Sequence, residues 1–273
     1  MKLLLGSLFF AGSALGAIAL TELVTDAFSG RKPNDGIELS LRHQVRTDNG
    51  TVEVVEQLTG GRGGTVSQWL VSGQSYYSEW NGREHTLRGR TLPSRTSAWI
   101  EFFVDRNGTE YLDRLLREQF VRRDQLSFLQ SSYAPSGDPK TWATADKVIE
   151  REDVLVREMG TDLAVCAENA RGDQKRSVCF LPGREPSLRR LSWVSTETAT
   201  WDFLNPIGLS GMGRVPRTLV LTVAGQERVR TSVSSFKAAK KEALATARSA
   251  ARSAANLPAA EVEEALKWIL RYR

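Results

Sequence analysis

Few side chains in this sequence have the type and spacing that acid–base, nucleophilic or metal chemistry requires. The 273 residues include two histidines, His43 and His85, and each lies in a segment with strand-like alternation. Neither has a cysteine or another histidine at the spacing of a zinc site, so we predict no metal site and interpret both as strand-face residues. The segment Gly208–Met212 (GLSGM) approaches the serine turn of hydrolases, but Met212 replaces the second glycine of that turn.

Two other patterns also lack the features of a reactive site. The segment Gly60–Gly64 (GGRGG) has no Lys-Ser/Thr pair after it and joins two predicted strands, unlike a phosphate-binding loop. Carboxylate pairs such as Asp105 with Glu110 have no distinctive spacing. We therefore predict that the protein is not an enzyme, with no catalytic residues and no cofactor.

The two cysteines have an informative spacing. Cys166 and Cys179 lie on short apolar segments that flank a polar turn at Arg171–Asp173. Because the turn lies midway between them, the two side chains should face each other across a hairpin and form a disulfide in an oxidising compartment. Closing so short a loop stabilises the fold by about 3 kcal/mol. The alternative is a pair of buried free thiols.

The first nineteen residues have the pattern of a secretory signal peptide. Met1–Lys2 precedes an uncharged apolar stretch that ends in Ala17-Ile18-Ala19, a small-x-small cleavage pattern. We predict a signal peptide over residues 1–19, a periplasmic location and no integral membrane domain in the mature chain. The alternative is an uncleaved anchor helix, for which the stretch is at the short limit of about 17–25 residues.

The composition is that of a globular protein, with 41% hydrophobic and 25% charged residues. These values exclude a disordered or collagen-like chain. The 37 basic and 32 acidic residues give a net charge of +5, and the two signs are interleaved along the chain. We therefore predict no nucleic-acid partner.

Strand patterns dominate the first part of the chain after the signal peptide. Alternation of apolar and polar residues between Ile37 and Arg90 predicts an antiparallel meander of about five strands, with turns at Asp48–Gly50 and Asn81-Gly82. A short helix is predicted before it, over Thr21–Phe28. Residues 99–129 then change to helical spacing and predict a helical insertion.

Strands return from about residue 148 to residue 203, and a last hairpin is predicted over 217–233. Together these elements predict an α+β fold with a strongly curved antiparallel sheet of about nine to eleven strands. The helical insertion should lie in its concavity. The glycine- and proline-rich segment Asn205–Pro216 is predicted to be a loop.

Helix-forming residues dominate the last part of the sequence. An alanine-rich helix is predicted from Phe236, after a cap at Ser234 or Ser235, and Pro258 should start a last helix. We predict a β-rich body over residues 20–235 and a helical extension over 236–273 that the body does not need for folding. The alanine-rich helix has little large apolar surface, so it should pack on the last helix or dock on a partner.

Large apolar side chains of the first meander and the helical insertion should be buried together. They could fill a core, which the sequence favours, or line an open cavity for an acyl chain or a hydrophobic peptide. The candidate ligand-binding residues for the second arrangement are Trp69, Tyr76, Trp80, Trp99, Phe102, Phe103, Leu112 and Leu116.

Three segments resemble the LolA/LolB-like superfamily of periplasmic lipoprotein carriers. They are Trp69–Tyr76 (WLVSGQSY), where Ser72-Gly73 stands in place of that family's Asp-Gly turn, Glu152–Val165 and Ser187–Leu191. The resemblance covers about residues 35–203 and implies an incomplete β-barrel with a helical lid. It also implies a hydrophobic ligand, either a lipid or an acylated lipoprotein, bound in the half-barrel.

Two kinds of function therefore remain open from the sequence. The first is an exported, non-enzymatic periplasmic protein that binds a hydrophobic ligand or lipoprotein in the cavity. The alternative is a cell-envelope interaction or assembly protein with a filled core, which contacts an envelope protein partner through its surface and its C-terminal helices.

Overall fold

The computed structural model describes residues 18–273 except for 30, 32–35, 62–63, 88–89, 93, 106, 127–128, 131–153, 183–185, 210–212, 241 and 255–257. The predicted signal peptide lies outside the described residues apart from its last two, Ile18 and Ala19. These two residues form strand β1, which pairs with β8 (Leu129–Gln130) in a small separate sheet.

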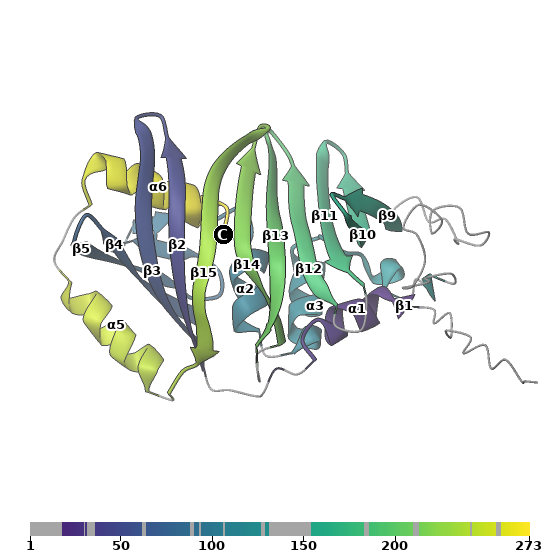
Figure 1. Ribbon diagram of the computed structural model, residues 1–273, viewed down its shortest axis with the longest axis horizontal. Helices are drawn as coiled ribbons and strands as arrows, with labels where there is room; N and C mark the ends of the chain where they lie inside the picture. Colours follow the sequence, from purple (N-terminus) through teal and green to yellow (C-terminus); the bar gives the residue numbers. More distant parts are fainter. Residues whose placement is uncertain are drawn as a thin grey trace, which may run out of the picture.

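One large antiparallel sheet forms the body of the protein (Figure 1). Its thirteen strands in the described chain are β2 (Gly36–Thr47), β3 (Gly50–Gly61), β4 (Gly64–Val71), β5 (Gln74–Trp80), β6 (His85–Leu87), β7 (Arg90–Leu92), β9 (Val154–Met159), β10 (Asp162–Arg171), β11 (Gln174–Leu181), β12 (Ser187–Val194), β13 (Thr198–Leu209), β14 (Gly213–Val223) and β15 (Gln226–Ala238). The spatial order is β7-β6-β5-β4-β3-β2-β15-β14-β13-β12-β11-β10-β9.

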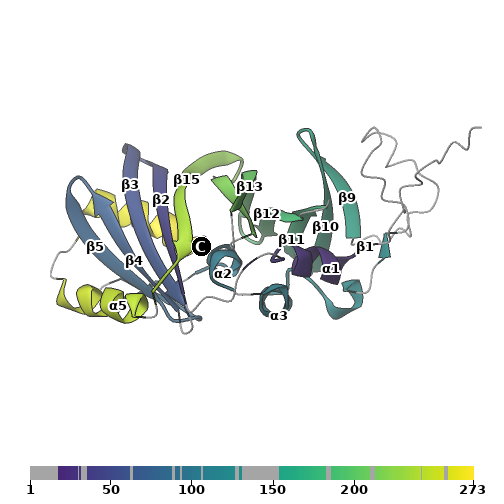
Figure 2. The same cartoon turned by 60° about the horizontal axis from the view of Figure 1, so that its bottom comes forward.

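The sheet is open, because the edge strands β7 and β9 do not pair with each other. It curves around the helices of the insertion (Figure 2), so the predicted incomplete barrel is confirmed. The strand number exceeds the predicted nine to eleven. Strand β15 pairs with β2 and so joins the last hairpin to the first meander, which makes a single sheet of both.

Alternation of side chains explains why the central strands form. In β2, Leu39, Leu41 and Val45 are buried, whereas Arg42 and Gln44 between them are exposed. This two-residue period places one apolar row on the concave face, where the main core lies. The hairpin turns also follow the sequence, since Ala224 and Gly225 have φ of 49° and 78°, as a tight two-residue hairpin turn requires.

The segment Asn205–Pro216 differs from its prediction as a loop. Strand β13 continues to Leu209, β14 begins at Gly213, and Pro206 lies opposite Pro216. In this part of the hairpin, Pro206 of β13 has no partner on β12, and Pro216 of β14 has no partner on β15. Prolines are tolerated in such a free-standing hairpin because no neighbouring strand needs their missing amide hydrogens.

Three helices lie together against the concave face (Figures 1 and 2). They are α1 (Leu20–Asp26), α2 (Ala98–Val104) and α3 (Gly108–Arg117), followed by a 3-10 turn over Arg123–Gln125. Their apolar side chains join the core cluster of the sheet, which confirms the predicted helical insertion. The side chain of Asn107 accepts a hydrogen bond from the amide of Glu110 at 2.9 Å and so caps α3.

Helices α1 and α3 cross closely at Gly108. A Cβ atom at this position would lie 2.3 Å from the Cα of Thr25 and 2.7 Å from the carbonyl oxygen of Val24. We expect Gly108→Ala to lower the free energy of unfolding by about 1–3 kcal/mol, because backbone atoms cannot move aside as a flexible side chain would. Urea denaturation measures this change. The control is Thr109→Ala at the exposed next residue, expected to change stability by less than about 0.5 kcal/mol, and a stabilised Gly108→Ala would contradict the close crossing.

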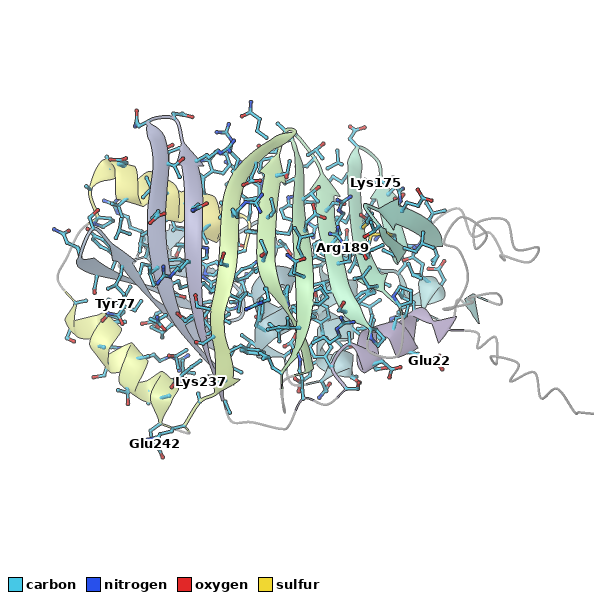
Figure 3. All side chains as sticks on the ribbon, in the orientation of Figure 1. Glu22, Tyr77, Lys175, Arg189, Lys237 and Glu242 are labelled. Atoms are coloured by element: carbon cyan, nitrogen blue, oxygen red, sulfur yellow. A yellow bond between two sulfur atoms is a disulfide. The ribbon has the colours of Figure 1, made fainter. Side chains whose placement is uncertain are left out.

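The two helices after the sheet occupy different faces. Helix α5 (Ala243–Ser253) contacts β3, β4 and β5 and buries none of its residues, and Tyr77, on the outer face of β5, lies beside it (Figure 3). Helix α6 (Ala260–Arg271) contacts β2, β7 and β15 on the concave face and adds to the core there. In the described chain, no helix is both long and apolar enough to cross a membrane.

The alanine-rich helix begins later than predicted. Phe236 belongs to β15, where it lies opposite Leu39 and its ring packs 5.7 Å from that of Phe103. The predicted boundary at residue 235 therefore falls inside a strand. Pairing with β2 and burial of the Phe236 ring outweigh the helix-forming residues that follow it in sequence.

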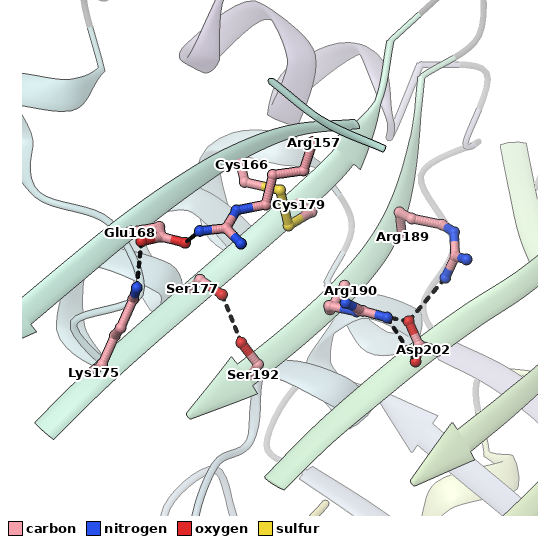
Figure 4. The surroundings of a disulfide bond; sticks show 10 residues. All are labelled: Arg157, Cys166, Glu168, Lys175, Ser177, Cys179, Arg189, Arg190, Ser192 and Asp202. Carbon is pink, nitrogen blue, oxygen red and sulfur yellow. Dashed lines mark hydrogen bonds and ion pairs between the residues drawn. A yellow bond between two sulfur atoms is a disulfide. The ribbon is translucent and has the colours of Figure 1, made fainter. Parts of the chain in front are cut away.

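Cys166 and Cys179 form a disulfide on the outer face of the sheet (Figure 4). They are direct partners across β10 and β11, with Cα atoms 4.0 Å apart, and pack with Met159 and Ala164 in a small apolar cluster. Nearby, Glu168 pairs with Arg157 and Lys175.

We expect replacement of this disulfide by Cys166→Ser/Cys179→Ser to lower the free energy of unfolding by about 3 kcal/mol, through the larger entropy of the unfolded chain. Urea denaturation with and without reductant checks this. In the same experiment, both thiols should resist alkylation in urea until reductant is added. Labelling of the unfolded chain without reductant would rule out the bond.

Candidate functional site

The eight predicted ligand-binding side chains gather on the concave face, where the strands and helices bring them into one core. Trp69 and Tyr76 are direct partners on β4 and β5. Trp99, Phe102 and Phe103 come from successive turns of α2 and have neighbouring ring centroids 5.6 Å apart. Seven of the eight are 7% exposed or less, and Leu116 is half-buried.

A further segment, absent from the predicted site, covers these side chains. Tyr272 and Arg273 follow α6 into the concavity, with exposures of 0% and 1%. The guanidinium of Arg273 lies 5.0 Å from the ring of Trp99 and 5.5 Å from that of Trp69. We call residues 260–273 the cover segment.

Hydrogen bonds hold the end of the cover segment in place. The indole of Trp201 donates to the Tyr272 carbonyl, and the hydroxyl of Ser94 donates to the Arg273 carbonyl at 2.7 Å. The amide of Arg95 donates to the Arg271 carbonyl at 2.7 Å. The cover segment is thus fixed both to the sheet and to the chain that leads into α2.

A buried polar network lies beneath the cover segment. Nη1 of Arg273 lies 2.6 Å from Oε1 of Glu56, whose Oε2 lies 3.0 Å from Nε2 of His43. Nδ1 of His43 lies 2.8 Å from the hydroxyl of Thr231. All four residues are 1% exposed or less.

The network keeps Glu56 ionised. Burial alone would raise the pKa of Glu56, but the charge of Arg273 and hydrogen bonds from His43 and Ser67 together outweigh it and hold the pKa at about 2. Burial in turn lowers the pKa of Arg273, against the attraction of Glu56. The pair is therefore a buried ion pair in which each charge depends on the other.

The order of Thr231, His43 and Glu56 is that of a nucleophile, a base and an acid. Catalysis would require a substrate to reach the Thr231 hydroxyl, but this residue is 0% exposed and Glu56 is already bound to Arg273. We interpret the network as an anchor for the cover segment. Among the described residues, no three His, Cys, Asp or Glu side chains gather as metal ligands would.

Both histidines lie on strand faces, as expected, but on the buried face rather than a polar one. The sequence contained a signal for this. His43 has the same parity as Leu41 and Val45, and Glu56 the same parity as Val54 and Leu58, so alternation alone places both inside the sheet. Nothing local marks Arg273 as their partner, because it is 217 residues away from Glu56.

A second buried carboxylate lies at the rim of the concavity. Oε1 of Glu101 accepts a hydrogen bond of 2.6 Å from the indole of Trp80, and its Oε2 lies 3.2 Å from Arg114. Burial raises the pKa of Glu101 to about 7, only partly offset by Arg114. His85 packs against Trp80, and burial, with help from Arg273, lowers its pKa to about 3, so its ring is neutral.

We expect Glu101 to make stability fall as pH rises from 4.5, its ordinary pKa, to about 7. In this range the folded chain holds a proton that the unfolded chain has lost, which costs roughly 3 kcal/mol of folding free energy above the range. Glu101→Gln should therefore become more stable relative to the wild type with rising pH, as urea unfolding at pH 5 to 8 would measure.

His85 acts in the opposite direction, since its depressed pKa makes stability rise with pH up to 6.5, its ordinary value. It contributes equally to the wild type and to Glu101→Gln, so the difference between the two curves isolates Glu101. A difference that is constant with pH would contradict the raised pKa.

Two clefts flank α3 at this rim. The larger, of about 450 Å³, lies between the turn after β5, residues 94–97, the end of α3 and Arg176 of β11. The smaller, of about 300 Å³, shares Arg114 and Arg117 with the larger one and is also lined by Asp105, Glu110 and Asp113. Trp80 reaches the larger cleft and is the predicted ligand-binding residue that lines it.

Comparisons with known proteins identify no residue of this site. No family model and no curated protein matches the sequence. Among solved structures, the chain is similar to a LolA superfamily protein from Nitrosomonas europaea, with a TM-score of 0.48 and 11% identity over 82% of this chain and 95% of that one.

Two other solved structures are similar as well. An outer membrane lipoprotein-sorting protein domain from Vibrio parahaemolyticus has a TM-score of 0.44 and 9% identity over 80% of this chain and 91% of that one. A DUF1329 family protein from Desulfovibrio piger has a TM-score of 0.37 and 7% identity over the same shares, 80% and 91%. At these identities no residue of the site can be aligned with a function.

Proposed function

We propose that this protein is an exported, non-enzymatic periplasmic protein that binds the acyl chains of a lipid or an acylated lipoprotein on the concave face of its sheet. One observation carries the proposal. The aromatic floor of the concavity, formed by β4, β5 and α2, is covered by the cover segment, which is a separate element rather than part of the sheet.

The cover segment is suited to exchange with an acyl chain. Leu266, Ile269 and Leu270 fill the concavity with side chains that are 1% exposed or less. A bound acyl chain could replace this apolar contact, gaining about 0.8 kcal/mol for each CH₂ group removed from water. The ligand-free protein would then be closed by its own chain, and binding would displace residues 260–273.

Export is supported by the cysteines as well as by the signal-peptide pattern. The disulfide between Cys166 and Cys179 forms in oxidising compartments such as the periplasm and is rare in the cytosol. This argument concerns the compartment only and is independent of the ligand.

The test is a titration with a soluble diacylated lipopeptide, with the same peptide lacking its acyl chains as the control. Tryptophan emission should change saturably with the lipopeptide alone, because Trp69, Trp80 and Trp99 line the proposed site. Mass spectrometry of a solvent extract should also find lipid in protein purified from the periplasm.

Limited trypsin digestion locates the site. If the ligand displaces the cover segment, cleavage after Lys267 and Arg271 should become faster with the lipopeptide and not with the control peptide. An emission change without faster cleavage would place the ligand elsewhere and contradict the displacement.

A second candidate is the envelope interaction protein with a filled core. The burial of Trp69, Trp99 and Phe102, each 0% exposed, favours it. No co-purified lipid and no emission change would support this candidate over the carrier.

A further inference from the structure

Guanidinium groups concentrate in the larger cleft beside α3. Its lining side chains include five arginines and one carboxylate, that of Glu118. The arginines come from four separate parts of the chain: the turn after β5, the segment before α2, helix α3 and strand β11. They are Arg83, Arg95, Arg114, Arg117 and Arg176.

Two of these arginines already have acidic partners. Arg114 lies 3.2 Å from Glu101 and 3.3 Å from Asp105, both of which line the smaller cleft. Arg95 lies 3.7 Å from Glu197. These two guanidiniums are therefore already engaged with carboxylates of the protein itself.

The single carboxylate of the cleft is also occupied. One oxygen of Glu118 accepts a hydrogen bond from the Thr96 hydroxyl, and both accept from the amide of Ser97, at 3.0 and 3.2 Å. The Ser97 hydroxyl donates to it as well. Glu118 is thus hydrogen-bonded by neutral donors, and within the described residues its charge attracts Arg176 without a direct ion pair.

Three guanidiniums have no carboxylate within ion-pair distance among the described residues, and one of the three, that of Arg176, is attracted by the more distant charge of Glu118. In the part of the chain that the structure describes, no carboxylate forms an ion pair with Arg83, Arg117 or Arg176. Arg176 is half-buried, lies 5.5 Å from the ring centre of Phe120 and donates to the carbonyl of Glu118. Burial lowers the pKa of Arg176 and the charge of Glu118 offsets this only in part, so a bound anion would further stabilise the guanidinium charge.

The C-terminal end of α3 could repel an anion, because the carbonyl groups there carry the negative end of the helix dipole. Here the carbonyls of Arg114, Leu115 and Leu116 accept hydrogen bonds from the amides of Glu118, Phe120 and Gln119. The exposed negative ends are therefore mostly covered, and the arginines dominate the field in the cleft.

We infer that this cleft binds a phosphate group through Arg83, Arg117 and Arg176. A phosphate offers several oxygens and up to two negative charges, which match three guanidiniums, whereas a carboxylate offers two oxygens and one charge. The volume of about 450 Å³ leaves room for a small group attached to the phosphate. Trp80 borders both this cleft and the proposed acyl site, but the phosphate inference does not depend on acyl binding.

Calorimetric titration of the full chain with inorganic phosphate tests the inference. Arg83 and Arg117 are exposed, so Arg83→Gln/Arg117→Gln should leave the fold intact. We expect this variant to bind phosphate at least about tenfold more weakly, since each lost charge-assisted hydrogen bond weakens binding severalfold or more. The matched control is Arg42→Gln/Arg46→Gln on the outer face of β2, which removes the same charge and should bind within about twofold of the wild type.

Any of three results would overturn the site. One is an equal loss of affinity in both double variants, which would mean that net charge alone attracts the anion. The others are acetate binding as tightly as phosphate, and no binding of phosphate at all to the wild type.

A second titration identifies the source of the phosphate group. Short-chain phosphatidylglycerol, used below its micelle concentration, presents the group as a lipid headgroup. Binding at least about tenfold tighter than inorganic phosphate, and weakened in Arg83→Gln/Arg117→Gln, would assign a phospholipid headgroup. Equal binding of the two probes would assign a free small phosphate, and both results support the phosphate site.

Discussion

Replacing Arg273 with methionine is expected to lower the free energy of unfolding by about 3–5 kcal/mol. The change leaves Glu56, which is 0% exposed, without the positive charge that holds its pKa at about 2. Glu56 would then keep only the hydrogen bonds from His43 and Ser67 against the cost of its burial. Urea denaturation near neutral pH measures the loss.

Two further variants separate the charge from the packing of the side chain. Arg271→Met removes the exposed arginine two residues earlier and should cost less than about 1 kcal/mol. In Glu56→Gln/Arg273→Met both charges of the buried ion pair are removed, so this double variant should be more stable than Arg273→Met alone. If Arg273→Met and Glu56→Gln/Arg273→Met are equally unstable, the loss of stability comes from lost packing on Trp69 and Trp99. The electrostatic explanation would then be wrong.

Deletion of residues 254–273 is expected to abolish the cooperative unfolding transition. It removes the buried side chains of Leu266, Ile269, Leu270 and Tyr272, all 1% exposed or less, and uncovers the aromatic floor. At about 1.5–3 kcal/mol for each buried apolar side chain, the loss approaches the whole stability of about 5–15 kcal/mol of a typical domain.

A pair of point variants tests the same contact without deleting a helix. Leu266→Ala, in the core, should cost about 2–5 kcal/mol. Leu244→Ala, at a half-buried position of α5, should cost much less, since α5 buries none of its residues. Thermal and urea unfolding of the two variants provide the comparison.

The sequence alone predicts a different outcome for truncation, namely a body that folds without residues 236–273. A truncated chain with a sharp transition would support that prediction and make the cover segment an independent module. If the truncated chain regains a transition only with the lipopeptide, the ligand has replaced the segment, as the proposed function requires.

The sequence by itself determined the elements whose signals are local. Alternation identified the strands of the first meander, and helical spacing identified the insertion that contains α3. A turn midway between Cys166 and Cys179 placed these two residues opposite each other. Each of these patterns depends on residues within a few positions or within one hairpin, so neighbouring side chains suffice to specify it.

Tertiary structure decided the features that join distant parts of the chain. Phe236 lies in a strand instead of a helix because β15 pairs with β2, almost two hundred residues earlier in the sequence. Residues up to Leu209 of β13 pair with residues from Gly213 of β14 because they lengthen a strand pair that the sheet already holds in place. In both cases long-range pairing and burial outweigh the local preferences of the residues.

The candidate site divides in the same way. The parity of Trp69, His43 and Glu56 in their strands could be read from the sequence, since a two-residue period fixes which face each side chain takes. The contact of Arg273 with Glu56 could not be read, nor could the gathering of arginines from four parts of the chain in one cleft. A charged side chain carries no sequence signal for its partner, because only the folded chain decides which opposite charge lies within hydrogen-bonding distance.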